Sequence, residues 1–336
     1  MRWLAPLLLG AVVVLGACSS DDAGAPPPCE GVAPEGREAC LTDYYFRGYG
    51  AQPVAPCAGF TPTSMKVAGR KEIDFFLGGT SVDAFARAEG QFLQRFYETY
   101  ELTFFTRNAA APAGLAYALD ASNVELARLP AQLGIPTNRD PTAEERARLD
   151  KAVGDLVFKS LRDFVARQSN PPRKSINVVV LDHIASPDVA ASFSGGVIAG
   201  LGLSPTLFAN IAADDASKNL FELIGLGPDF TPTLFVGHGD VVRLARSPDV
   251  IVSHELGHAM GLQHTQAQGD LMTQFSASKE CLPGLTDKEI EVLKRTGTFL
   301  RSDDGAAVRG QEMHDARRLF DLRDALVRGV LAGRQR

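Results

Sequence analysis

One short stretch that begins at His254 reads HELGHAMGLQH and holds three histidines and a glutamate. His254 and His258 are four residues apart, so on a helix they share a face and can offer two imidazole nitrogens to one metal ion. Glu255, beside the first histidine, can reach a metal-bound water and act as a general base. Gly261 can adopt the left-handed conformation that ends a helix, after which the chain can turn back with His264 as a third ligand. Three protein ligands and one open position are typical of a catalytic zinc site.

The pattern H-E-x-x-H-x-x-G-x-x-H resembles that of the metzincin metallopeptidases, in which a tight turn with a methionine follows below the zinc. Met272, eight residues after His264, stands where that methionine would be. The specific resemblance covers about residues 247–274, and the order of the expected elements extends it to about 66–300. It implies a metzincin-like α/β (α+β) fold with a mixed twisted sheet, an active-site helix and a small C-terminal subdomain.

The resemblance also implies a function, that of a zinc-dependent metalloendopeptidase acting on proteins or peptides. Zn²⁺ on the three histidines would activate a water for which Glu255 is the general base, while Gly261 and Met272 would support the site. The alternative is a catalytically inert, lipid-anchored binding protein that retains the fold. Such a protein has no use for a general base, so the glutamate favours the peptidase.

The N-terminus predicts export. After a short positive start, the apolar run at 4–15 is too short to span a bilayer as a helix and fits a secretory signal peptide. The run leads into Leu-Gly-Ala-Cys, which resembles the lipobox of bacterial lipoproteins and implies a signal peptide at 1–17 and a lipid on Cys18. Because Ser19 rather than an aspartate follows, we expect anchoring at the outer membrane or cell surface. A soluble secreted or periplasmic protein is the alternative.

Four further cysteines indicate two disulfides in an exported protein, namely Cys29, Cys40, Cys57 and Cys281. Three pairings are open, and we favour Cys29–Cys40 with Cys57–Cys281, which would staple the N-terminal segment near the metal site. A cysteine that blocks the zinc, as in some metzincin propeptides, is the rival interpretation, but the surrounding Arg and Asp of that switch are missing. Residues 18–64 are therefore expected to form a lipid-anchored tether and a cysteine-containing segment, either retained or removed as a propeptide.

The composition is that of a globular protein, with 45% hydrophobic and 22% charged residues. The net charge of −6 argues against nucleic-acid binding through a basic face. We expect a zinc metallopeptidase domain over 65–300 and a C-terminal helical tail over 301–336, whose apolar residues pack on the domain or on a partner.

The rest of the pattern predicts a mixed α/β core that must hold the metal-site helix. Strands are expected at 72–77, 101–106, 176–181 and 233–236. Helices are expected from about 80 to 100, from Thr142 to Asn170, from Ser247 through the motif, and after Thr286.

Two histidines and one glycine-rich segment outside the motif are less informative. His183 ends an expected strand, and we interpret it as structural. His238 lies between two glycines and is either a cleft residue or a surface or capping residue. The segment 195–203 is either an edge strand along which substrate would lie extended, or a loop that simply turns.

Overall fold

The computed structural model describes residues 31–33, 36, 56–78, 82–122, 126–136, 138–170, 175–191, 198–205, 208, 220–240, 251–265, 267, 269–273, 282–296 and 313–332. Some sequence predictions lie outside these residues, namely the signal peptide at 1–17, Cys18, Cys29, Cys40, Ser247 and Cys281.

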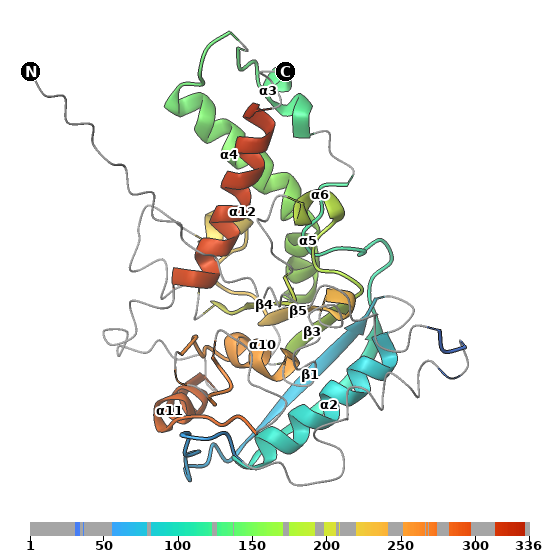
Figure 1. The fold of residues 1–336 in the computed structure, drawn as a ribbon, viewed down its shortest axis with the longest axis vertical. Helices are drawn as coiled ribbons and strands as arrows, with labels where there is room; N and C mark the ends of the chain where they lie inside the picture. The colour runs from blue at the N-terminus through green and yellow to red at the C-terminus, as the bar shows by residue number, and fades with distance from the viewer. Residues whose placement is uncertain are drawn as a thin grey trace, which may run out of the picture.

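A five-stranded mixed sheet runs through the centre of the described chain (Figure 1). Its strands are β1 (Gly69–Leu77), β2 (Leu102–Ala110), β3 (Ile176–Leu181), β4 (Gly200–Leu203) and β5 (Thr233–Gly237). They lie in the order β2-β1-β3-β5-β4, and β4 is antiparallel to β5 while the other neighbours are parallel. The predicted mixed α/β class is therefore confirmed.

Strand β2 is longer than predicted. It stays in parallel register with β1 until Leu77 pairs with Ala110, four residues beyond the predicted end. Its second half reads Thr-Arg-Asn-Ala-Ala and is exposed, so it has no hydrophobic alternation to reveal a strand. Pairing with β1, rather than its own side chains, extends this strand.

The central strands are buried on both faces because helices cover both sides of the sheet. Along β3, Val178 and Val180 point into one core, and Val179 and Leu181 point into the other, as alternation in a pleated strand requires. The first core is closed by α2 (Val82–Glu98), α10 (Ile251–Ala259) and α11 (Asp287–Thr296). The second is closed by α4 (Ala143–Val157), α5 (Lys159–Gln168) and α12 (Met313–Ala332) (Figure 1).

The prediction of one continuous helix from Thr142 to Asn170 is wrong, because the chain turns at Phe158 between α4 and α5. Phe158 has φ −88° and ψ 3° and is fully buried. The turn lets α4 pack against α12 while Phe164 of α5 reaches the sheet and contacts Phe76 edge-on. The predicted start is confirmed, since Thr142 and Glu145 form a reciprocal capping box.

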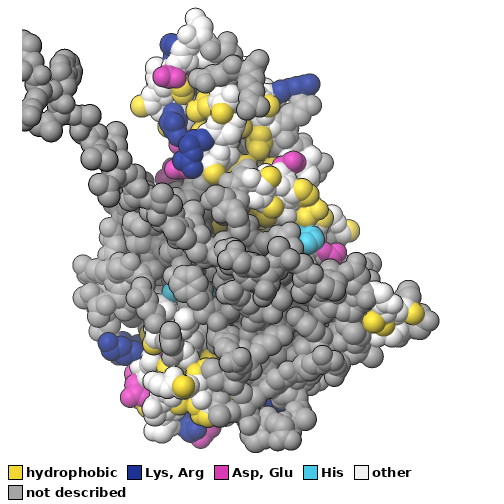
Figure 2. Space-filling model, viewed as in Figure 1, with side chains coloured by type: hydrophobic (Ala, Val, Ile, Leu, Met, Phe, Trp, Pro, Cys, Tyr) yellow, Lys and Arg dark blue, Asp and Glu magenta, His cyan; other side chains and the backbone are white. Residues whose placement is uncertain are grey.

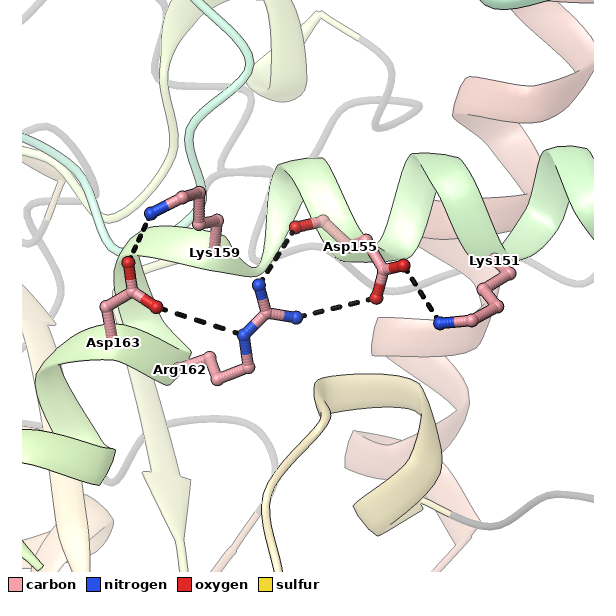
Figure 3. A network of polar contacts seen from close by, with 5 residues as sticks. All are labelled: Lys151, Asp155, Lys159, Arg162 and Asp163. Carbon is pink, nitrogen blue, oxygen red and sulfur yellow. Dashed lines mark hydrogen bonds and ion pairs between the residues drawn. The ribbon is translucent and has the colours of Figure 1, made fainter. Parts of the chain in front are cut away.

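Ion pairs bridge this turn (Figure 3). Arg162 lies between Asp155 of α4 and Asp163 of its own helix, while Lys151 pairs with Asp155 and Lys159 with Asp163. These side chains are 24–76% exposed, so each pair is worth about 0.5 kcal/mol or less. The apolar core, rather than this network, holds the two helices on the sheet.

The C-terminal helix α12 packs on the domain. Leu319, Leu322, Leu326 and Val327 are buried in the second core, and the helix contacts α3 and α4. Charged side chains of both signs lie near one another on the upper part of the molecule, which these helices form (Figure 2). The remaining short helices are η1 (Leu126–Arg128), α3 (Leu129–Gln132), α6 (Pro187–Ala190) and α8 (Leu220–Ile224).

Two predictions on export and crosslinking can be followed only in part. Within the described ranges, no helix has both the length and the apolar character needed to cross a membrane. Cys57 is buried and disulfide-bonded. Because the other cysteines lie outside the described residues, the two pairings stay a prediction.

Candidate metal centre

Helix α10 carries the metal motif and lies against β4, β5 and α2. Two buried side chains of α2 fix its first turn. The Val252 N–H donates to the Glu89 carboxylate over 3.2 Å, and the Tyr97 hydroxyl donates to the Ser253 carbonyl over 2.9 Å. Burial raises the pKa of Tyr97 well above its usual value, so the hydroxyl remains a donor at neutral pH. The start of the metal helix is thereby tied to its neighbour.

Helix α10 is terminated by a glycine, Gly261. Gly261 has φ +93°, a left-handed conformation that strains residues with a side chain. The Leu262 N–H donates to the Gly257 carbonyl over 2.8 Å, and the Gly261 N–H donates to the His258 carbonyl over 2.9 Å. These two bonds make a Schellman motif. Gly261 thus has the conformation predicted for it, and the chain reverses toward His264.

The structure brings the three motif histidines together. The Nε2 atom of His264 lies 3.1 Å from the Nε2 of His254 and 3.1 Å from the Nε2 of His258. The Nδ1–H of His254 donates to the Leu271 carbonyl over 2.7 Å, and that of His258 donates to the Leu262 carbonyl over 2.9 Å. These bonds fix the tautomer of both helix histidines, so their unprotonated Nε2 atoms face a shared point.

This donor set fits zinc. Two nitrogens bound to a tetrahedral zinc at about 2.0–2.1 Å lie about 3.3 Å apart, close to the 3.1 Å separations found here. The three ligand atoms lie within 4.8 Å of one another. Three imidazoles leave a fourth position for water or substrate, as catalytic zinc sites do.

The predicted methionine turn lies against the metal helix. Met272 is fully buried, and its sulfur lies so close to Gly257 that a Cβ at that position would be 2.4 Å away. The Met272 N–H donates to the Asp270 carboxylate over 2.8 Å, which closes the turn. The same turn contains the Leu271 carbonyl that orients His254. It therefore supports both the helix and one of its metal ligands.

Glu255 is buried in the contact between α10 and the edge strand β4. The strand comes so close that a Cβ at Gly200 would lie 2.2 Å from a Glu255 carboxylate oxygen. A Cβ at Gly202 would lie 2.6 Å from the Cβ of His258. The end of the glycine-rich segment is therefore a strand that packs on the metal helix, and residues 192–197 lie outside the described ranges.

Two buried carboxyl groups join the methionine turn to α11. Burial, and secondly the nearby Glu289, raise the pKa of Asp270 to about 8, and burial also raises the pKa of Glu289. The Glu289 carboxylate caps α11 by accepting from the N–H of Thr286 over 2.7 Å and from its hydroxyl over 2.8 Å. Two buried carboxylates in contact repel unless they share a proton. We therefore infer that the pair holds one proton at neutral pH.

His183 and His238 lie at the carboxyl ends of β3 and β5 and are not part of the three-histidine group. The Nδ1–H of His183 donates to Asp240 over 3.0 Å, and the same carboxylate accepts from the Ile184 N–H over 3.3 Å. This pairing agrees with a structural role for His183. His238 is buried, and a role for it in the cleft stays a prediction.

Sequence reasoning missed the groups that position the motif. These are Glu89, Tyr97, Asp270 and the carbonyls of Leu262 and Leu271. Glu89 carried a signal, since a charge four residues from both Phe85 and Leu93 lies on the apolar face of a helix. The carbonyls of Leu262 and Leu271 gave no signal in the sequence, because every residue has a backbone carbonyl.

The comparisons with known proteins give structural likenesses only. No protein-family model and no curated protein matches the chain. Metalloproteinase-II from Bacteroides fragilis matches with a TM-score of 0.35 and 12% identity over 76% of this chain, which spans 61% of that protein. Archaemetzincin from Methanopyrus kandleri matches with a TM-score of 0.36 and 14% identity over 68% of this chain and 95% of that one. Both TM-scores lie below 0.5, so these likenesses carry no conclusion about function.

Proposed function

We propose that this chain is a zinc-dependent metalloendopeptidase. The observation that carries the proposal is the convergence of three histidine nitrogens within 4.8 Å, with a buried glutamate directly after the first histidine. A protein that only binds metal needs the histidines but has no use for Glu255. The proposed substrates are proteins or peptides, because zinc with a general base is suited to the hydrolysis of amides.

The residues of the site have separate roles in this proposal. The three histidines would hold a zinc ion, which when bound would supply Lewis acidity and make a water acidic enough to lose a proton near pH 7. Glu255 would accept that proton on its carboxylate and return it to the leaving amine, an assistance typically worth ~10²–10⁴-fold in rate. The carbonyls of Leu262 and Leu271 keep His258 and His254 aimed at the metal.

The proposal is tested by hydrolysis of a generic protein such as casein by the purified chain. We expect cleavage that stops when a chelator removes the metal and returns when zinc is added back. The folded, zinc-loaded protein is compared with the same preparation stripped of metal. If the zinc-loaded protein cleaves nothing, the inert binding protein becomes the better account.

We propose further that the chain is exported and anchored through a lipid on Cys18, at the outer membrane or the cell surface. The supporting observations are the apolar N-terminal run and the Leu-Gly-Ala-Cys sequence that ends it. The net charge of −6 supports a protein that does not bind nucleic acid. A soluble secreted or periplasmic protein is the alternative.

A further inference from the structure

The segment 56–63 lies against the part of the chain that follows the third histidine. The Cys57 N–H donates to the Leu282 carbonyl over 3.1 Å, and the Thr63 N–H donates to the Leu285 carbonyl over 3.2 Å. The Thr63 hydroxyl also donates to the Asp287 carboxylate at the start of α11. In Figure 1 the blue segment that leads into β1 runs beside α11. The segment is thus paired through its backbone at both ends.

Between these two ends, the side chain of Phe60 occupies the space that two glycines leave open. A Cβ at Gly284 would lie 2.3 Å from Cε1 of the Phe60 ring, and a Cβ at Gly269 would lie 2.7 Å from the Cβ of Phe60. Any side chain at Gly284 would displace the ring. Phe60 and the two glycines therefore form one close contact between the segment 56–63 and the part of the chain that follows the third histidine.

The two glycines lead directly to a histidine. The Gly284 N–H donates to the Gly269 carbonyl over 2.9 Å, and the Leu271 N–H donates to the Gly284 carbonyl over 2.8 Å. The carbonyl of that same Leu271 accepts the Nδ1–H of His254 over 2.7 Å. A shift of Gly284 therefore moves the Leu271 peptide, and with it the group that aims the His254 ring.

We propose that residues 56–63 are a permanent brace of the metal site, and that Phe60 is a positioning residue that sets the His254 ring through Gly284 and Leu271. The proposal rests on the proposed function only in that the three histidines bind zinc. It also decides between the two fates of the N-terminal segment. A propeptide is removed without loss to the mature site, whereas a brace must stay, so the mature chain begins before Pro56.

The test is a double-mutant cycle on zinc affinity. Phe60→Ala, Gly284→Ala and the double variant are compared with the parent, and Phe60→Leu provides a milder change that keeps most of the apolar bulk. Phe105→Ala is the matched control, because this phenylalanine is 52% exposed on β2 and makes none of the contacts that define the brace. Zinc dissociation constants are measured by competition with a chromophoric chelator, at a temperature where circular dichroism shows every variant folded. The visible spectrum of the cobalt-loaded protein reports the ligand geometry.

Outer groups that orient a metal ligand typically change affinity by about 10–100-fold when lost. We expect losses of that order for Phe60→Ala and Gly284→Ala, a smaller loss for Phe60→Leu, a changed cobalt spectrum for all three, and no change for Phe105→Ala. The double variant should lose less than the two single losses combined, since the new methyl fills space that the ring has left.

Two results would overturn the brace. One is a lower melting temperature in the Phe60 variants with unchanged zinc affinity and cobalt spectrum, which would mean that Phe60 is only part of the packing. The other is a natural mature protein that begins after Thr63 and binds zinc as tightly as the full chain. Zinc affinity is measured without substrate, so it tests the brace independently of peptidase activity. If the parent binds no zinc, both this inference and the proposed function fail.

Discussion

The close approach of strand and metal helix makes Gly202→Ala a demanding test of the site. The added methyl carbon would lie 2.6 Å from the Cβ of His258 and 2.9 Å from the carbonyl oxygen of Glu255. Ordinary carbon contacts are about 3.5–4.0 Å long, so β4 and α10 must move apart by about 1 Å. Neither contact atom is the end of a flexible side chain that could swing away.

Overpacking of this kind costs about 1–3 kcal/mol. For a domain of this size, about 2–4 °C of melting temperature corresponds to each kcal/mol, so the metal-free variant should melt about 2–12 °C lower. Zinc binding should weaken as well, because His258 is part of the contact that must open. Calorimetry of the metal-free protein and chelator competition for zinc measure the two effects separately.

The matched control is Gly90→Ala on α2, where an added methyl meets no atom within 4 Å. Alanine is the better helix former by about 0.5–1 kcal/mol, so this variant should be as stable as the parent or slightly more so. If Gly202→Ala melts and binds zinc as Gly90→Ala does, the proposed contact between the edge strand and the metal helix is wrong.

Three other changes test the surroundings of the site. Asp270 keeps its proton up to about pH 8 in the folded protein but loses it near pH 4 in the unfolded chain. The free energy of unfolding should therefore fall from about pH 4 to pH 8, by up to about 1.4 kcal/mol per pH unit. Asp270→Asn should flatten that slope in urea unfolding of the metal-free protein, and equal slopes would contradict the buried-pair account. Met272→Leu, a change close in volume, should cost less than about 1.5 kcal/mol and keep zinc bound; loss of zinc would show that the sulfur does more than pack. Cys18→Ser should release the protein from membranes or block its processing, and unchanged fractionation would refute the lipid anchor.

The sequence predicted the elements whose periodicity reflects burial. The strand at 176–181 is found at its predicted bounds because it is buried throughout, and the strand at 233–236 is longer by one residue. Strand β2 was predicted too short because pairing with β1, which leaves no pattern in the residues, sets its second half. The break in the helix at Phe158 was not predicted, because the stripe of apolar residues continues across it.

The site was predictable as far as its side chains have recognisable chemistry. Spacing alone indicated that His254, His258 and His264 converge, and the structure places them so. What spacing could not indicate is the set of partners from distant parts of the chain, such as Glu89 on α2 and Phe60 in the N-terminal segment. These partners are defined by contacts across more than 150 residues, and a single sequence contains no record of such contacts.

The central claim is that Glu255 acts as the general base beside a zinc held by three histidines. Glu255→Gln keeps the size of the side chain that packs against Gly200 and removes no proposed metal ligand. Zinc content and the rate of protein cleavage are measured on the same preparation, with His258→Ala as the comparison that should lose both. We expect Glu255→Gln to bind zinc as the parent does and to cleave about 10²–10⁴-fold more slowly. A zinc-loaded Glu255→Gln protein that cleaves at the parent rate would contradict the account.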